Sequence, residues 1–220
     1  MKNSVISARR AHCFLFLSAM LVLAPWVLAA KVQVQDEAGQ PLNDAVVWAL
    51  PLDTEVVTLP VEQHYQMDQV NRRFVPHVLP VPVGALVDFP NSDSIMHHVY
   101  SFSAVKTFEI KLYKGRPQTP LLFSKPGVVE LGCNIHDWML GYIVVVDTPL
   151  FAKTDAKGEA DLTLASGRYR VSLWYHRFDD IGHPETRELD YQGEETLVLS
   201  VIQTLRPEPE PLGADELDGY

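Results

Sequence analysis

Three residues that can bind a soft metal ion lie within one short segment, at Cys133, His136 and Met139. They supply a thiolate, an imidazole and a thioether, a set of donors that selects copper over hard cations such as magnesium or calcium. Zinc fits this set less well, because structural zinc sites rarely include methionine. Two histidines and one cysteine with a weak axial methionine form the electron-transfer copper arrangement, so the segment lacks one imidazole.

The missing imidazole has four upstream candidates: His64, His77, His97 and His98. The adjacent pair is the best placed of these, because it follows a polar loop at 91–94 and begins an expected strand at 97–102. Successive side chains of a strand point to opposite faces, so only one member of the pair can reach the metal. We interpret the remaining histidines as ordinary surface or hydrogen-bonded residues: His64, His77, His176 and His183.

The first thirty residues have the layout of a secretory signal peptide. A basic start, with Lys2, Arg9 and Arg10, precedes an apolar stretch at 13–28, and we expect cleavage near Ala29 or Ala30. The alternative is a membrane anchor, but the apolar run is shorter than the about 20 residues that a span requires. We therefore expect a periplasmic protein with no membrane span after the signal is removed.

Signal removal changes the significance of the cysteines, because Cys13 leaves with the signal and Cys133 becomes the single cysteine of the mature chain. An oxidising compartment is hostile to an idle thiol. A lone cysteine there is buried and inert, paired with another chain, reactive or bound to a metal. Its neighbours His136 and Met139 favour the metal.

The mature chain is strongly acidic. Loss of the signal lowers Lys plus Arg from 18 to 15 and leaves Asp plus Glu at 28, so the net charge falls from −10 to −13. This charge argues against nucleic acid or an anionic membrane as a partner. It favours a redox partner protein with a basic docking patch.

The pattern of the chain predicts an all-β protein. Sixteen prolines and twelve glycines, with abundant valine and leucine, indicate short strands and turns, and no stretch has a sustained helical period. We expect a hairpin over 31–49 and an edge or irregular strand ahead of Val83 and Gly84, because that strand contains three prolines. Further strands are expected at 97–102, 108–113, 128–131, 141–146, 160–164, 167–174 and 197–201.

One part of the chain resembles the cupredoxins. The sequence FPNSDSIMHHVYS, followed by a Pro-Gly turn and CNIHDWMLGYIVVV, is similar to proteins of the plastocyanin and amicyanin type, often labelled methylamine-utilisation proteins. The resemblance covers about 66–147 and implies a Greek-key sandwich with one copper ion. The ligands that it implies are His97, Cys133, His136 and Met139. Two positions depart from the family pattern, His98 where asparagine is common and Asp137 where proline is common.

The flanks of this segment resemble a second kind of sandwich. KVQVQDEAGQPLNDAVVWALP and TDAKGEADLTLASGRYRVSLWYH are similar to the strands of transthyretin-like, carboxypeptidase-regulatory-like or Ig-like modules. Either one sandwich is split by the cupredoxin segment, or an N-terminal strand pair and a separate C-terminal sandwich flank it. The expected organisation is a signal at 1–30, sandwich strands at 31–60, a copper domain at 61–148, further sandwich strands at 149–205 and a disordered acidic tail at 206–220.

These features support one leading hypothesis, a one-electron copper carrier with His136 as its exposed electron port beside Trp138 and Leu140. A copper carrier or storage protein would use the same ligands, and a scaffold protein with a vestigial site would bind no stoichiometric copper. An enzyme is the weakest alternative, because four protein ligands leave no open position for a substrate. We interpret the tryptophans as packing residues: Trp48, Trp138 and Trp174.

Overall fold

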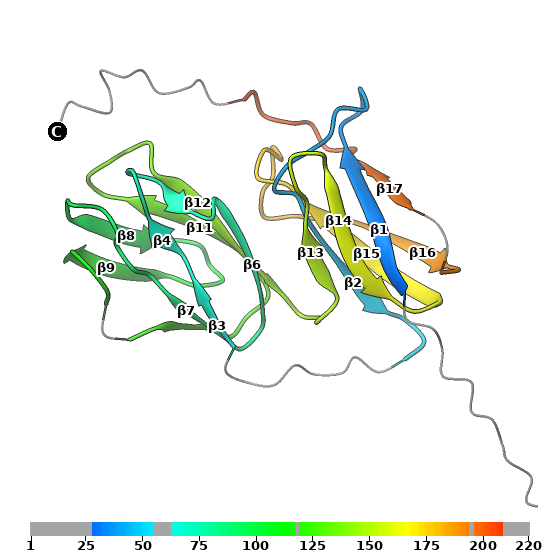
Figure 1. The fold of residues 1–220 in the computed structure, drawn as a ribbon, viewed down its shortest axis with the longest axis horizontal. Helices are drawn as coiled ribbons and strands as arrows, with labels where there is room; N and C mark the ends of the chain where they lie inside the picture. The colour runs from blue at the N-terminus through cyan, green and yellow to red at the C-terminus, as the bar shows by residue number, and fades with distance from the viewer. Residues whose placement is uncertain (1–27, 55–62, 118, 194–195, 209–220) are drawn as a thin grey trace, which may run out of the picture.

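A computed structural model describes residues 28–54, 63–117, 119–193 and 196–208. Every regular element in these ranges is a β-strand, which confirms the all-β prediction (Figure 1). The strands form two sandwiches that lie side by side. The first 27 residues of the predicted signal peptide, and residues 209–220 of the predicted tail, fall outside the described ranges. No helix in the described ranges has the length and apolar character that crossing a membrane requires.

One sandwich is built from both ends of the chain. Its first sheet has the order β14-β1-β17 and its second the order β13-β2-β15-β16. The bounds of these strands are β1 Leu28–Gln35, β2 Val46–Pro51, β13 Phe151–Lys153, β14 Glu159–Leu164, β15 Gly167–Trp174, β16 Glu185–Tyr191 and β17 Leu197–Ser200. Strands from before and after the central segment therefore share both sheets, and we call this unit the flanking sandwich.

The predicted hairpin over 31–49 is wrong. β1 pairs with β14 and β17, whereas β2 pairs with β13 and β15 in the opposite sheet. The chain crosses between the sheets at Leu42, which is buried in the core that both sheets share. The turn at 39–41 suggested a hairpin, but Val34 and Val47 are both fully buried in this core and pack from opposite sheets.

The central segment forms the second sandwich, which we call the insert. A five-stranded sheet in the order β6-β12-β11-β8-β9 faces a three-stranded sheet in the order β10-β7-β3, with a short pair β4-β5 beside them. The bounds are β3 His64–Gln66, β4 Asp68–Gln69, β5 Phe74–Val75, β6 Val78–Pro82, β7 Ala85–Asp88, β8 His97–Ser101, β9 Phe108–Tyr113, β10 Leu121–Phe123, β11 Gly127–Cys133 and β12 Leu140–Val146. The proline-rich β6 is an edge strand, as predicted.

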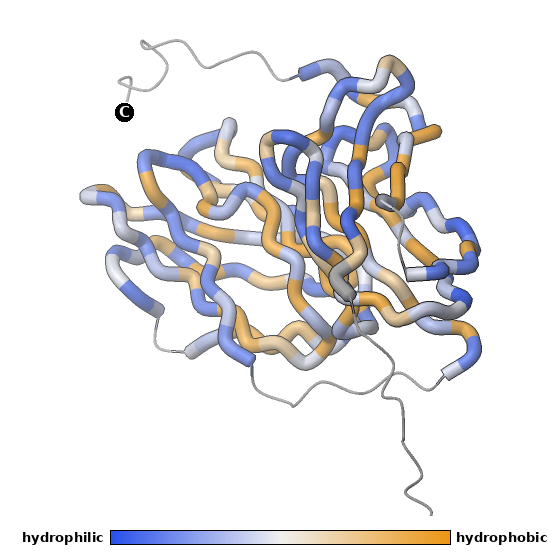
Figure 2. Tube along the Cα trace, turned by 45° about the vertical axis from the view of Figure 1, so that its right-hand side comes forward, coloured by the Kyte–Doolittle hydropathy of each residue, from blue (hydrophilic) through white to orange (hydrophobic). Residues whose placement is uncertain are grey.

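The two sandwiches share a contact along β12, whose side chains alternate between two cores. Ile143 and Val145 belong to the core of the insert, whereas Tyr142, Val144 and Val146 belong to the core of the flanking sandwich. This alternation follows the period of two of a strand, here with both faces buried. Figure 2 shows hydrophobic positions along the strands in the interior of both sandwiches.

Besides the hairpin and the short unpredicted strands β3, β4, β10 and β13, two further parts of the chain differ from the sequence prediction. β16 was not predicted, because its sequence ETRELDY is mostly charged and only its last residue is fully buried. The tail predicted to be disordered from Arg206 begins with an ordered segment. The Arg206 N–H donates to the carbonyl of Arg177 at 2.7 Å, and Arg177 pairs with Glu208.

Candidate metal site

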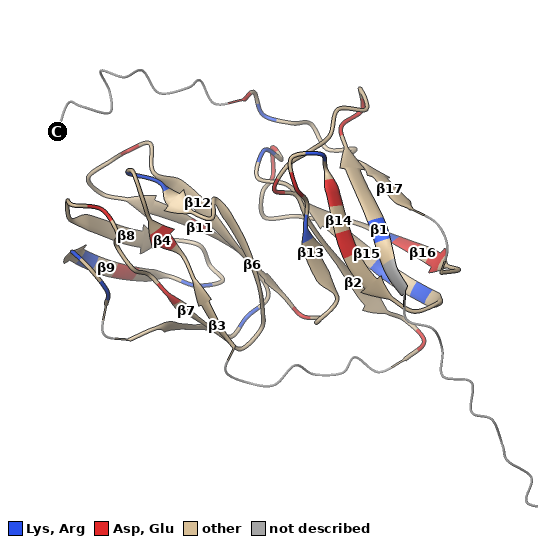
Figure 3. Ribbon diagram, in the orientation of Figure 1, with Lys and Arg blue, Asp and Glu red and all other residues tan. Residues whose placement is uncertain are grey.

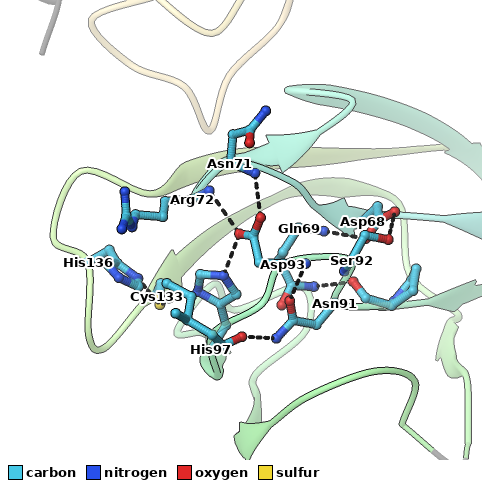
Figure 4. Close-up of polar contacts among 12 residues, drawn as sticks. Asp68, Gln69, Asn71, Arg72, Asn91, Ser92, Asp93, His97, Cys133 and His136 are labelled. Carbon is cyan, nitrogen blue, oxygen red and sulfur yellow. Dashed lines mark hydrogen bonds and ion pairs between the residues drawn. The ribbon is translucent and has the colours of Figure 1, made fainter. Parts of the chain in front are cut away.

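The four predicted ligands come from two neighbouring strands and the loop that follows one of them. His97 is the first residue of β8 and Cys133 is the last residue of β11. These strands are paired antiparallel with Cys133 opposite Val99, which brings the two ends together. His136 and Met139 lie in the loop between β11 and β12 (Figure 4 shows the two histidines and the cysteine).

His97 and His136 both direct their Nδ1 atom toward Cys133. His97 Nδ1 lies 3.8 Å from Cys133 Sγ, and His136 Nδ1 lies 3.7 Å from it. These three donor atoms are mutually within 4.8 Å, and this is the one such cluster of His, Cys, Asp and Glu in the part of the chain that the structure describes. The exposed fraction is 0% for His97, 1% for His136 and 2% for both Cys133 and Met139.

Strand alternation separates the two adjacent histidines. His97 is directed inward, whereas His98 is directed outward, where its Nε2 lies 2.8 Å from Glu109 Oε1. The other upstream histidines lie elsewhere. His64 contacts Asp88 at the surface, and His77 Nδ1 is 3.1 Å from the Leu140 carbonyl oxygen.

Asp93 holds His97 in the orientation that a metal ligand needs. Its Oδ2 accepts from His97 Nε2 at 2.8 Å and from the Arg72 N–H at 2.9 Å, and its Oδ1 accepts from the Asn71 N–H at 2.6 Å (Figure 4). Burial raises the pKa of Asp93, but these hydrogen bonds outweigh burial and lower it. Because a carboxylate only accepts, Nε2 carries the proton, and the Nδ1 lone pair is left for the metal.

The sequence analysis missed Asp93. The signal for it was weak, an acidic residue four positions before His97 in a polar loop. Its backbone partners are further away in the sequence. Asn71 and Arg72 both have positive φ angles, 53° and 55°, which turn their N–H groups toward the carboxylate.

The surroundings of Cys133 favour its thiolate. Burial raises the pKa of this thiol, but hydrogen bonds with His97, with the backbone of His98 and Ile135, and with His136 outweigh burial and lower the pKa to about 6. At neutral pH the sulfur is therefore largely ionised, which is the form that binds a metal. Burial lowers the pKa of His97, and its contacts with Cys133 and Asp93 more than reverse this.

The expectation that His136 is exposed is wrong. Only 1% of it is accessible, because the loop folds its ring between His97 and Trp138. The centroid of the His136 ring lies 5.0 Å from that of His97 and 5.2 Å from that of Trp138. An electron that leaves this site by the His136 edge would have to cross other groups first.

The donor set fits a copper ion. Two imidazole nitrogens and a thiolate converge in a buried space. The neighbouring carboxylate of Asp93 already accepts hydrogen bonds from three N–H groups. A thioether is buried in the same loop at Met139. Soft and borderline donors without a free oxygen ligand suit copper and disfavour magnesium or calcium.

The comparisons with known proteins match less than half of this chain in each solved structure named below. No protein-family model matches it, and no curated protein matches it. Among solved structures, a purple cupredoxin from Nitrosopumilus maritimus is 24% identical, with 37% of this chain and 98% of that chain covered and a TM-score of 0.34. An amicyanin variant in its Cu(I) form is 23% identical, covering 38% and 82%, with a TM-score of 0.34. A copper-containing nitrite reductase from Thermus scotoductus is 26% identical, covering 44% and 25%, with a TM-score of 0.35.

Proposed function

We propose that this chain is an exported, periplasmic copper protein that carries one electron at a time. The observation that supports this most is the buried cluster of His97, Cys133 and His136, with Met139 in the same loop. These four residues would hold one copper ion, which supplies the one-electron couple when bound. The proposed redox partner is a protein with a basic surface, since the mature chain would carry a net charge of −13.

The surrounding residues support this proposal because they fix the ligands before any metal binds. Asp93 orients His97, and two backbone N–H groups are hydrogen bonded to Cys133. A site held in one geometry reorganises little when its charge changes, which favours rapid electron exchange. Four protein donors leave no open position for a substrate, so we do not propose an enzyme.

The test is a visible spectrum and metal analysis of the protein exported in copper-replete cells. We expect one copper per chain and an intense thiolate-to-copper band. Cys133→Ser should abolish the band, and the control His64→Gln should keep it, because His64 contacts Asp88 and lies outside the metal cluster. Wild-type protein that takes up Cu(II) without ever showing the band would contradict the proposal.

The second candidate is a copper carrier that transfers its metal. The same ligands would serve, but their exposed fractions of 2% or less disfavour exchange by direct attack of an acceptor. Metal retained on mixing with a metal-free acceptor, together with reversible one-electron voltammetry, supports the electron carrier. Rapid loss of the metal supports delivery.

A further inference from the structure

The flanking sandwich covers only part of the outer face of the five-stranded sheet. At the β6 and β12 side, Val78, Tyr142 and Val144 are buried in the core of that sandwich, and Tyr142 packs against Trp174 with ring centroids 5.3 Å apart. Gly132 pairs with Leu140 on one side and with Tyr100 on the other, so these positions share one face of the sheet. Glu130, opposite Tyr142, lies on the same face.

A groove of about 370 Å³ lies where this cover ends. Residues of β8, of β11 and of the loop between β11 and β12 form one side, and Ile181 of the flanking sandwich contributes to the other. Phe102 is 82% exposed and Leu140 is 41% exposed, and both line the groove. The rings of Tyr100 and Phe102 pack together with centroids 5.0 Å apart. Exposed apolar side chains gathered in one place are typical of an interaction site.

The groove reaches the candidate metal site itself. Cys133 and Met139 both contribute to its wall, although both are almost completely buried. The ring of Tyr100 lies directly against Gly132, so close that a Cβ atom added at that glycine would be 2.7 Å from the ring. The segment that carries Phe102 is tied to the same strand, since Ser103 Oγ accepts from the Glu130 N–H at 2.9 Å. A molecule seated in the groove would therefore contact a wall that two of the candidate ligands help to form.

The charge of the groove indicates what would bind there. Glu130 and Asp137 line it and are exposed, and neither forms an ion pair with any residue in the described ranges. No lysine or arginine lines the groove. Aromatic residues beside unpaired acidic groups complement an apolar surface bordered by lysine or arginine, and such charge complementarity speeds encounter and fixes orientation.

We propose that this groove, and not the covered edge of His136, is the docking surface for the redox partner, a protein whose apolar contact patch is bordered by basic side chains. The proposal rests on the proposed electron-transfer function for its purpose. Its geometry rests on the insert and the flanking sandwich together, which gives the flanking sandwich a role in recognition.

The experiment uses the ¹⁵N-labelled, metal-free full chain titrated with mitochondrial cytochrome c, a protein whose apolar haem edge is ringed by lysines. We expect the amide shifts to concentrate on 100–103, 130–133 and 137–140 and at Ile181. The double variant Glu130→Lys/Asp137→Lys should raise the dissociation constant about ten-fold more than a control with the same net charge change. The control is Glu159→Lys/Asp190→Lys, on β14 and β16 of the flanking sandwich, where Figure 3 shows other acidic positions.

Shifts centred on another surface, or equal weakening by both double variants, would overturn the groove as the docking site. The readout needs no bound copper, so it separates this inference from the proposed function. Protein that binds copper but places cytochrome c elsewhere contradicts only the docking proposal. Protein that binds cytochrome c in the groove but never takes up copper supports the docking surface and contradicts the electron-carrier function.

Discussion

Replacement of Asp93 by asparagine tests whether the ligands are held in place from outside the metal site. The carboxylate accepts three N–H groups, two on Oδ2 and one on Oδ1. An asparagine has one accepting oxygen, so either orientation of its amide turns an NH₂ group toward at least one of these donors. If the NH₂ group faces His97, a buried donor is left without an acceptor, which costs about 1–3 kcal/mol, whereas the Asn71 N–H is exposed and can bind water.

This cost leads to a definite expectation for metal affinity. Loss of a carboxylate that orients a histidine ligand typically weakens metal binding about 10–100-fold, or about 1.4–2.8 kcal/mol. We expect Asp93→Asn to raise the dissociation constant for Cu(I) by this factor, measured by competition with a coloured Cu(I) chelator. Nitrogen NMR of His97 should also show that its proton is no longer confined to Nε2.

The matched control is Asp88→Asn. Asp88 also contacts a histidine ring, His64 at 3.3 Å, but that histidine is more than half exposed and lies outside the metal cluster. Its variant should bind copper as the wild type does. An Asp93→Asn protein whose affinity stays within two-fold of the control would refute the argument that this carboxylate prepares His97 for the metal.

Three further predictions concern single residues of the insert and the flanking sandwich. His97→Gln should lose the visible copper band while His98→Gln retains it, because only His97 faces Cys133, and equal loss in both variants would contradict this assignment. Gly141→Ala should lower the free energy of unfolding in urea by about 1–3 kcal/mol, since the new Cβ would lie 2.8 Å from Phe74 Cβ; an unchanged midpoint would contradict it. Burial, and secondarily the nearby His77, lower the pKa of His176 to about 4. Because a histidine of the unfolded chain titrates at about 6.5, the unfolded chain binds more protons than the folded chain below that pH. The free energy of unfolding therefore falls progressively from about pH 6.5 to about pH 4. By pH 4.5 this loss is about 2–3 kcal/mol, and His176→Phe should remove that part of the pH dependence; identical pH profiles for the two proteins would contradict it.

The ligands were accessible to sequence reasoning because their signals are local. Cys133, His136 and Met139 lie within seven residues. Strand alternation predicts that only one of His97 and His98 reaches the metal, and the cupredoxin resemblance implied His97. The structure places His97 with Cys133 and turns His98 toward Glu109. Short-range spacing and period-two alternation depend only on neighbours in the chain, and with the family resemblance they were enough to name the ligands.

The features that sequence reasoning missed depend on distant parts of the chain. β1 and β2 belong to opposite sheets because their partners lie more than a hundred residues later, which no turn signal at 39–41 can reveal. The role of Asp93 requires two left-handed residues at 71 and 72 to approach it. The burial of His136 depends on how the loop folds its ring against His97, which belongs to the earlier strand β8.

The most direct test of the central claim is a crystal structure of the copper-loaded protein with an anomalous difference map at the copper absorption edge. We predict one strong peak per chain, bounded by His97 Nδ1, Cys133 Sγ and His136 Nδ1, with Met139 beside it. A peak at the protein surface, or one bonded to His98 with the cluster left without metal, would contradict the account.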